Sequence, residues 1–322
     1  MGLLAAVKEH TSCQLVACCE EDVENSLVND SIEITHTDCD KMLAEVDCDV
    51  IAVGDYYEKR GSIIISALKA GKHVIADKPI CTTLDELATI DNLSKAKQLS
   101  VGCQLDLRSE GWCRTMRTMV NDGKLGEVHT ITFSGQHPLA VGVRPDWYFQ
   151  DNCHGGTIND IAIHGIDLIP WMTGRKIAEV VAARGWNARC EANKSFQDGA
   201  QMMLRLDNDG GVLADVSYLK PEKCTAPLKQ YWRFTVHGSG GMMEACYGCE
   251  SIEYISMEDE GIQAIPCEPN APHAYLDEFL REIAGETIDA IGLTTEQVIE
   301  SARVTLLAQK AADKGCCNLS CK

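Results

Sequence analysis

The sequence predicts an α/β domain with a doubly wound parallel sheet, followed by an α+β domain with an open-faced, mostly antiparallel sheet. Short β-rich runs alternate with helical stretches over the first hundred or so residues. The second half instead pairs strand-like runs across glycine-containing turns. The length of 322 residues exceeds one typical domain and suits two. We expect domains over 1–106 and 107–322, and leave open whether the last helix packs back on the first domain.

Continuous apolar runs between helical stretches predict the parallel sheet of the first domain. Such runs are typical of strands that are buried on both faces. The helix that begins near Arg60 stops at Gly71, and a Thr83-x-x-Glu86 capping box begins the next helix. We expect strands over 14–19, 32–35, 48–54, 72–76 and 99–103, and helices over 38–46, 60–70 and 83–98.

Antiparallel pairing is predicted in the second domain, because strand-like runs flank two glycine-containing turns. The first turn is 207–211 and the second is 238–241. A Thr294-x-x-Gln297 capping box begins the closing helix, which stops at Gly315. We expect strands over 127–134, 202–206, 212–219, 232–236 and 242–245, and helices over 111–121, 274–284 and 295–314.

The charge balance excludes several classes of partner. Asp and Glu number 48 against 29 Lys and Arg, and the net charge of −19 opposes binding to nucleic-acid phosphates. No apolar run approaches the roughly 18 residues that span a bilayer. The N-terminus has no basic leader, since an apolar start meets Lys8 and Glu9 at once. We therefore expect a cytoplasmic protein with neither nucleic acid nor membrane as partner.

Seventeen cysteines raise the question of disulfides or metal. Disulfide-dense domains are small and secreted, whereas this chain is long enough to bury its own core. Cys246 and Cys249 form one CxxC motif without a second pair at zinc-ribbon spacing. Cys316, Cys317 and Cys321 lie in the C-terminal tail. We predict reduced, unpaired thiols and no metal.

Lys78 is the first candidate for chemistry. It follows the strand expected over 72–76, and ligands of open α/β sheets bind at the carboxyl ends of the strands. Pro79 holds the residue before it in an extended geometry, so that Lys78 can point into the crevice. The alternative is an ordinary solvated lysine.

A helix that follows Gly155-Gly156 carries the second group of candidates. Its ionisable residues are Asp160, His164 and Asp167, and spacings of four and three place them in one line. Most of the other residues of the helix are apolar. Histidine titrates near neutrality, and a carboxylate can orient it as a general base requires. The alternative is a buried, structurally satisfied His–Asp pair.

Glu20 is the candidate for cofactor discrimination, because it follows the strand expected over 14–19. An acidic residue at the end of the second strand of a dinucleotide-binding sheet can accept from a ribose 2′-hydroxyl. With Glu21 and Asp22 it would repel the 2′-phosphate, so we favour NAD over NADP. The alternative is that Glu20 is merely solvated.

Together these segments resemble the Gfo/Idh/MocA family, the glucose–fructose oxidoreductase and inositol dehydrogenase group. The resemblance runs from residue 1 to about 315. Its marks are LVACCEED, ALKAGKHVIADKPI, RPDWYFQDNCHGGTINDIAIHGIDLIPWMTG, HGSGGMMEA and a last helix begun by Thr-Thr-Glu. The resemblance implies a Rossmann-like first domain, a sugar, inositol or related polyol as substrate, and NAD(H) or NADP(H) as hydride carrier.

The resemblance also implies roles for three residues. In that family the lysine of a Glu-Lys-Pro-like motif, here Lys78, lies beside the nicotinamide and the substrate. The Asp and His of the glycine-opened helix match Asp160 and His164. These three residues are therefore the expected catalytic group.

Two stretches depart from the family pattern. Gly54-Asp55 stands where the family has a Thr-Pro-containing turn, and we place Gly54 and Asp55 with Glu20 and Lys78 as cofactor-binding residues. The chain begins where the family's first helix is under way, so the first strand and the Gly-x-Gly-x-x-Gly pyrophosphate loop are missing. Either the sequence is truncated at its N-terminus or dinucleotide binding is impaired.

The leading hypothesis is an NAD-dependent dehydrogenase of a secondary alcohol in a sugar, cyclitol or glycoside. His164 would take the hydroxyl proton, Lys78 would hydrogen-bond the developing alkoxide, and Asp160 would orient His164. One alternative is an enzyme of the same fold that recycles bound NAD while it processes glycosides. The other is a non-catalytic sugar-binding paralogue that has lost the cofactor loop.

The uneven alternation of residues 212–219 predicts self-association. Apolar residues are available to both faces of this strand, and helices would cover only one face of the sheet. A second copy of the same face would give a self-complementary contact. We therefore expect a homodimer, or a homotetramer built from such dimers; family members often pair through this sheet.

Overall fold

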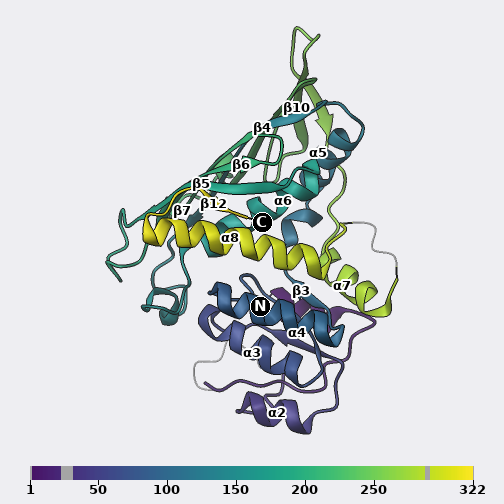
Figure 1. Ribbon diagram of the computed structural model, residues 1–322, viewed down its shortest axis with the longest axis vertical. Coiled ribbons are helices and arrows are strands. Elements are labelled where there is room, and N and C mark those ends of the chain that lie inside the picture. The colour runs from purple at the N-terminus through teal and green to yellow at the C-terminus, as the bar shows by residue number, and fades with distance from the viewer. Residues whose placement is uncertain (1, 23–31, 287–290, 322) are drawn as a thin grey trace. The chain divides into compact units, whose positions relative to one another are not determined.

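The chain folds into two compact units. The structure, a computed structural model, describes residues 2–22, 32–286 and 291–321 (Figure 1). Unit 1 consists of Met1–Gln104 and Tyr275–Ile299, and unit 2 of Leu105–Ala274 and Glu300–Lys322. The first change of unit lies close to the boundary expected after residue 106, and the chain then returns to unit 1 for most of one helix and the start of the next.

Unit 1 contains a three-stranded parallel sheet in the order β1-β2-β3. The strands are β1 (Val50–Val53), β2 (His73–Ala76) and β3 (Val101–Cys103). The helices are α1 (Gly2–Glu9), α2 (Cys39–Glu45), α3 (Tyr57–Lys69), α4 (Leu84–Lys97) and α7 (Ala274–Ala284). Helices α3 and α4 pack together, and α3 buries Ile64 and Leu68 beside the central strand. The capping box of Thr83 and Glu86 forms as predicted at the start of α4.

Two runs that we expected to be strands of this domain are not strands. Over 14–19 and 32–36 the structure has one isolated bridge, between Cys19 and His36. An apolar run becomes a strand only where a neighbouring strand satisfies its backbone groups. Here Cys18 and Glu20 share backbone hydrogen bonds with residues 35–36, and no further ladder extends from them in the described residues.

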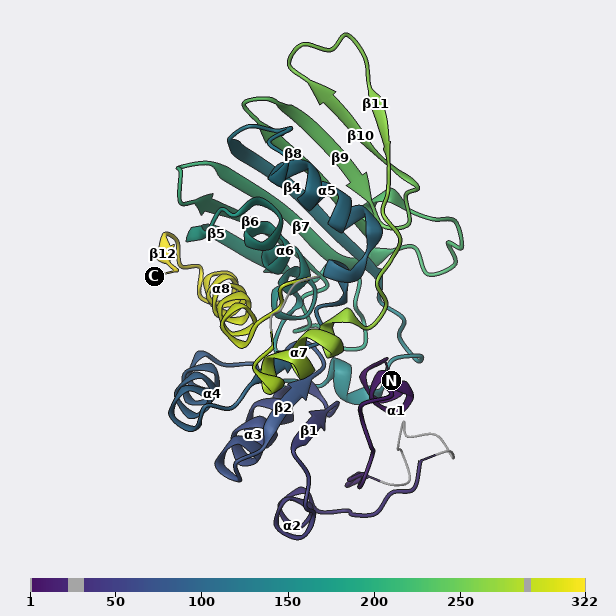
Figure 2. The ribbon, with the colours of Figure 1, turned by 90° about the vertical axis from the view of Figure 1, so that its right-hand side faces the viewer.

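Unit 2 contains a nine-stranded sheet in the order β11-β10-β9-β8-β4-β7-β6-β5-β12 (Figure 2). Its strands are β4 (Val128–Pro138), β5 (Ile177–Trp186), β6 (Gly199–Leu206), β7 (Gly211–Lys220), β8 (Trp232–Gly238), β9 (Gly241–Cys246), β10 (Ser251–Ser256), β11 (Gln263–Pro266) and β12 (Leu319–Ser320). Neighbours pair antiparallel except β4 and β7, which are parallel. The predicted fold class, a doubly wound type of parallel sheet followed by a mostly antiparallel one, is confirmed.

The two faces of this large sheet differ. Helices α5 (Gly111–Asn121) and α6 (Ile163–Thr173) lie on one face (Figure 2), and α8 (Thr295–Lys314) contributes residues to the same unit. Along β7, Val212, Ala214 and Val216 are buried, whereas Leu213 between them is 53% exposed. On β6 the neighbouring Met203 is 48% exposed. The second face thus carries exposed apolar side chains, as the uneven alternation predicts.

The helix predicted after Gly155-Gly156 has two parts. A π-helical turn covers Ile158–Ala162, and α6 follows directly. Gly156 has φ +98°, and a β-carbon there would lie 2.1 Å from the side chain of Gln309, so this position requires glycine. The Gln309 carboxamide of α8 accepts from the backbone N–H of Ile158 and Asn159, which satisfies two otherwise unpaired donors of the helix start.

None of the seventeen cysteines forms a disulfide, and all of them lie in the residues that the structure describes. Cys249, of the CxxC motif, lies near Cys267 outside that motif: the two Sγ atoms are 3.9 Å apart. In the part of the chain that the structure describes, no group of three or more His, Cys, Asp or Glu side chains is arranged to hold a metal ion.

Across the described ranges, no helix has the length and apolar character needed to cross a membrane.

Candidate functional site

The loops that follow β1 and β2 carry three of the predicted cofactor and catalytic positions, Gly54, Asp55 and Lys78. Gly54 and Asp55 follow β1, and Asp77 and Lys78 follow β2, so both pairs lie at the carboxyl edge of the parallel sheet. The Lys78 Nζ atom lies 5.9 Å from the ring centroid of Tyr57 on α3. The structure therefore places Lys78 at the edge where the sequence predicts it.

This edge fits a bound dinucleotide. The Oδ1 atom of Asp77 is buried and has no hydrogen-bond partner among the described residues, so a donor on a bound group could satisfy it. The other carboxylate oxygen lies 3.7 Å from the position that a β-carbon on Gly54 would take, so the glycine leaves the space beside the carboxylate open. Gly54, Asp55, Asp77 and Lys78 are the residues of this edge that could hold part of such a cofactor.

The acidic run around Glu20 has a cationic neighbour that lies far from it in the sequence. Lys59 on α3 donates to Glu21 at 2.6 Å, and this contact is the main reason that the pKa of Lys59 is raised. The Glu20 carboxylate accepts from the backbone N–H of Asp22. No Lys or Arg occurs in the ten residues after Asp22, but α3 supplies one from a distant part of the chain.

In unit 2, the carboxylate of Asp160 is the centre of a buried polar network. Its Oδ2 atom accepts from the hydroxyl groups of Tyr148, at 2.5 Å, and of Tyr218. The two hydroxyl groups lie 2.9 Å apart, and Nε2 of His154 is 3.0 Å from the Tyr218 hydroxyl and 3.6 Å from Asp160. All four side chains are buried. The two tyrosine hydroxyls thus hold the Asp160 carboxylate by donating to the same oxygen.

His164 and Asp167, the other members of the predicted polar line, have partners of their own. The Nδ1 atom of His164 lies 3.9 Å from a carboxylate oxygen of Asp106, and its ring meets the edge of Trp232. Asp167 forms two hydrogen bonds with Arg108, at 2.6 and 2.7 Å. The predicted orientation of His164 by Asp160 stays a prediction, whereas Asp167 is part of a structural ion pair.

An arginine lies beside the tyrosine pair. The guanidinium carbon of Arg144 is 4.4 Å from the ring centroid of Tyr148 and 5.3 Å from that of Tyr218. Its Nε donates to the backbone carbonyl of Leu139. A cation over the face of these rings is electrostatically favourable.

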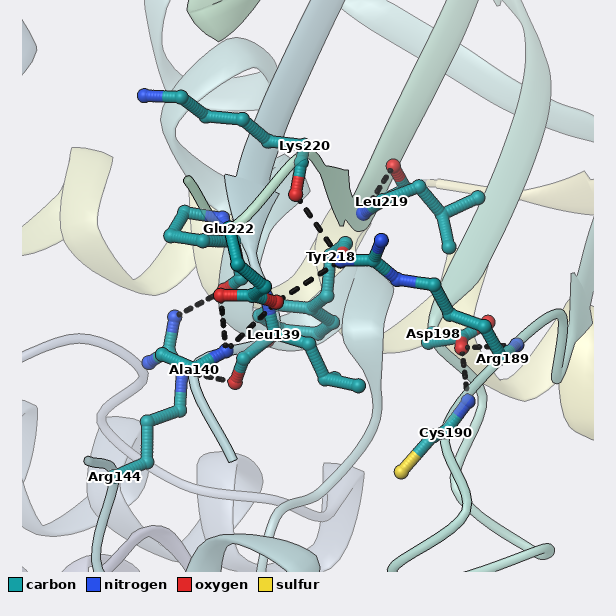
Figure 3. A network of polar contacts seen from close by, with 12 residues as sticks. Leu139, Ala140, Arg144, Arg189, Cys190, Asp198, Tyr218, Leu219, Lys220 and Glu222 are labelled. Carbon is teal, nitrogen blue, oxygen red and sulfur yellow. Dashed lines mark hydrogen bonds and ion pairs between the residues drawn. The ribbon is translucent and has the colours of Figure 1, made fainter. Parts of the chain in front are cut away.

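The loop that carries Arg144 is fixed by a second polar network (Figure 3). The carboxylate of Glu222 accepts from the backbone N–H of Leu139 and Ala140, and from the guanidinium of Arg189 at 2.9 Å. Arg189 also donates to the carbonyl of Lys220 at the end of β7. The loop that carries Arg144 is therefore linked by hydrogen bonds to the end of β7, the strand that carries Tyr218.

Sequence reasoning missed Tyr148, His154 and Tyr218. Tyr148 and Tyr218 are 70 residues apart in the chain and are neighbours only because the fold joins them. The one local signal was His154, which directly precedes the Gly155-Gly156 pair. A histidine beside a glycine pair that begins a polar helix would have been a reasonable further candidate.

Models of the two domains of one protein family match this chain. "Oxidoreductase family, NAD-binding Rossmann fold" matches residues 3–104, and "GFO/IDH/MocA C-terminal domain" matches residues 113–244. These matches confirm the predicted NAD-type cofactor and the predicted class of enzyme, the NAD-dependent dehydrogenases.

Several curated proteins are similar to this chain. The 1,5-anhydro-D-fructose reductase of Ensifer adhaerens is 26% identical over 286 residues, which cover 87% of this chain and 82% of that protein. The inositol 2-dehydrogenase 2 of Saccharopolyspora erythraea is 27% identical over 54% of this chain and 48% of its own length. The levoglucosan dehydrogenase of Pseudarthrobacter phenanthrenivorans is 24% identical over 48% of this chain and 40% of its own length.

Solved structures share the fold. A putative oxidoreductase from Thermotoga maritima has a TM-score of 0.85 at 22% identity and covers 99% of this chain and 97% of its own. An oxidoreductase from Agrobacterium radiobacter, solved in complex with NAD+, L-tartaric acid and magnesium, has a TM-score of 0.79 at 17% identity, with 99% and 94% covered. At these identities the likeness shows the fold.

Proposed function

Because the chain belongs to the Gfo/Idh/MocA family of oxidoreductases, we propose that it transfers a hydride between NAD(H) and a secondary alcohol of a sugar, cyclitol or glycoside. The observation that carries the proposal is the buried carboxylate of Asp160, which accepts from two tyrosine hydroxyls. Asp160 lies on the π-helical turn that continues directly into α6, the helix of His164. The similar proteins named above support the substrate class, since their names specify an anhydrosugar or a cyclitol.

In this proposal His164 acts as the general base and takes the proton of the alcohol. The Lys78 ammonium donates a hydrogen bond to the alkoxide that develops as the proton leaves, which stabilises negative charge in the transition state. Asp160 orients the histidine, and its negative charge stabilises the imidazolium that forms. NAD supplies the hydride acceptor when bound.

Two substitutions test the assignment. Lys78→Met and His164→Ala should each lower kcat by roughly a hundredfold or more, since general base and electrostatic contributions have this size. Lys69→Met and His129→Ala are matched controls, because both side chains are exposed and lie away from the candidate residues. Alcohol oxidation is followed through NADH absorbance with a panel of sugars, cyclitols and glycosides. Near-normal turnover in both site variants would contradict the assignment.

The same panel separates the proposal from its alternatives. Release of an aglycone without net NADH would identify NAD-recycling glycoside processing. Binding of a sugar without turnover of any compound in the panel would identify a non-catalytic paralogue. We propose that the protein works in a reducing compartment such as the cytoplasm, because none of its seventeen cysteines is paired in a disulfide.

We also propose that the protein is a homodimer, or a tetramer of such dimers, joined by the second face of the large sheet. A depression of about 760 Å³ lies on this face, and Met203, Leu213 and Thr235 contribute to its lining. Exposed apolar side chains in a shallow depression are suited to a self-complementary contact. Light scattering at about 0.15 M salt tests it. A mass near 35.2 kDa would show a monomer and contradict the proposal.

Leu213→Glu should split the assembly, because it places a charge in the centre of the contact. Val143→Glu is the matched control, since Val143 is 86% exposed on a loop outside the sheet. If Leu213→Glu left the mass of the assembly unchanged, another surface would hold the subunits together.

A further inference from the structure

A buried arginine ties together the two loops at the carboxyl edge of the parallel sheet. Arg60 lies in the first turn of α3 and is 4% exposed. Its Nε donates to the backbone carbonyl of Asp55 at 2.6 Å, and its Nη1 donates to the carbonyl of Lys78 at 2.5 Å. The same nitrogen lies 3.3 Å from the carbonyl of Pro79. One guanidinium thus joins the loop after β1 to the loop after β2.

Two further contacts fix the orientation of this guanidinium. It lies over the ring of Tyr57, with 4.6 Å between the guanidinium carbon and the ring centroid. Its Nη2 atom is 3.9 Å from Oδ2 of Asp77, the residue that precedes Lys78. The planar group is therefore held by an aromatic face, by a carboxylate and by backbone carbonyls from both loops.

This arrangement is more specific than burial of a charge requires. A single carboxylate would be enough to pair a buried cation, but Arg60 instead donates hydrogen bonds to backbone carbonyls of the two loops at the carboxyl edge of the sheet. Only a planar group with several donors in fixed directions can reach two loops at once, and a lysine ammonium cannot reproduce that fork. Because the carbonyl of Lys78 itself is an acceptor, the backbone from which the lysine side chain extends is fixed directly.

We propose that Arg60 is a positioning residue, which anchors the loop after β2 to the loop after β1 and thereby sets the place of Lys78 against the bound substrate. The proposal rests on the proposed function, in which Lys78 stabilises the alkoxide. Misplacement of a catalytic group by about 1 Å can lower a rate a hundredfold, so a residue that acts only through backbone carbonyls can have a large effect on turnover.

A double-mutant cycle tests whether Arg60 acts through Lys78. Arg60→Met should lower kcat roughly tenfold or more in the otherwise unchanged protein, with the KM for the alcohol changed by less than about threefold. In a Lys78→Met background the same substitution should lower kcat by less than about threefold, because there is no lysine left to position. Equal losses in both backgrounds would show independent effects and overturn the proposal.

Two variants separate geometry from charge. Arg60→Lys keeps the positive charge but cannot bridge both loops, so its kcat should fall to within about threefold of that of Arg60→Met. Full activity in Arg60→Lys would show that charge alone is needed and would overturn the proposal. Lys69→Met removes an exposed cation from the last turn of the same helix and should leave kcat unchanged.

Hydrogen exchange distinguishes failure of this inference from failure of the proposed function. In Arg60→Met, amide exchange should accelerate in peptides that contain residues 54–57 and 76–81, while peptides from β4–β9 keep their protection. This measurement needs no substrate. If the unchanged protein oxidises no alcohol, the proposed function fails, and unchanged exchange in both loops would then overturn the positioning role as well.

Discussion

The two groups of predicted catalytic residues are held by different physical means. In unit 1, Lys78 follows a strand, and the contacts that fix it reach its backbone carbonyl through Arg60. In unit 2, Asp160 lies in a buried helical segment, and the contacts that fix it reach the carboxylate itself through Tyr148 and Tyr218. One site is therefore positioned through the main chain and the other through side chains.

This difference predicts how the two regions respond to substitution. A side chain that extends from a fixed loop can be removed without opening a cavity, so a change at Lys78 affects turnover more than stability. A buried carboxylate with several donors cannot be removed without leaving those donors unpaired. We therefore expect changes around Asp160 to alter stability and turnover together.

The largest expected effect concerns the ion pair that supports the helix of the second site. Arg108 and Asp167 are each 1% exposed and form two hydrogen bonds, and Ser301 of α8 donates to the same carboxylate. Arg108→Met leaves the charge of Asp167 buried without this partner and should lower the free energy of unfolding by about 3–5 kcal/mol. Urea unfolding followed by fluorescence measures the loss.

Arg114→Met is the control for this prediction. Arg114 pairs with Glu268 at 2.9 Å, but the two side chains are 27% and 33% exposed. A partly solvated pair contributes little, so we expect a loss of about 1 kcal/mol or less. Equal losses in the two variants would mean that burial does not distinguish the pairs, and would weaken the contrast between the two regions.

The second prediction addresses the side-chain network around Asp160. Tyr148→Phe and Tyr218→Phe each remove one donor to the same carboxylate oxygen, and each should lower the free energy of unfolding by about 1–2 kcal/mol. The remaining hydroxyl can partly compensate, so the double variant should lose more than the sum of the single losses. A strictly additive result would show that the two hydroxyls act independently, and it would be visible in the same urea titrations.

The sequence was sufficient for features that depend on local pattern. The alternation of apolar runs and helices predicted the parallel sheet of β1, β2 and β3, and the capping box at Thr83 predicted the start of α4. Glycine-containing turns predicted the hairpins β6–β7 and β8–β9. Lys78 was placed at the sheet edge because it lies two residues after the end of a strand, which is a statement about neighbours in the chain.

The sequence was insufficient where distant segments decide the structure. The apolar run over 14–19 has strand-like residues, but pairing with a neighbour decides whether a strand forms. The partners of Asp160 come from residues 148, 154 and 218, and those of Asp167 from residues 108 and 301. A one-dimensional spacing rule placed Asp160, His164 and Asp167 in one line but carried no information on what each would face.

The third prediction concerns the acidic run of unit 1 and the choice of cofactor. Glu20→Gln removes a charge expected near the ribose, and Glu21→Gln removes the carboxylate that neutralises Lys59. Each change should lower the dissociation constant of NADP relative to that of NAD by roughly two- to fivefold, the size of a surface charge effect. Lys59→Met should raise the ratio of these two constants. Fluorescence titrations at one fixed salt concentration measure it, and a ratio insensitive to all three changes would place the 2′-position elsewhere.

The smallest expected effect is a pH dependence of stability that arises in unit 1, at His73 on β2. Its Nδ1 atom accepts from the backbone N–H of Ser100 at 2.9 Å, a contact that requires the neutral ring. Burial lowers the pKa of His73 below its ordinary value of 6.5, and the charges of Asp49 and Glu282 offset part of this shift. The folded protein therefore favours the neutral form of this histidine.

The sign of the effect follows from proton binding. Below about pH 6.5 the unfolded chain takes up a proton at this histidine more readily than the folded chain does, so stability falls as the pH falls through that value toward the lowered pKa of the folded state. His73→Asn keeps a side-chain acceptor but does not titrate in this range, so the decrease of Tm between pH 7.5 and pH 5 should be smaller in the variant than in the unchanged protein. His129→Asn, at an exposed position on β4, is the control and should keep the full decrease. If His73→Asn also kept the full decrease, other groups would carry the pH dependence, and the main-chain contact of His73 would have no part in it.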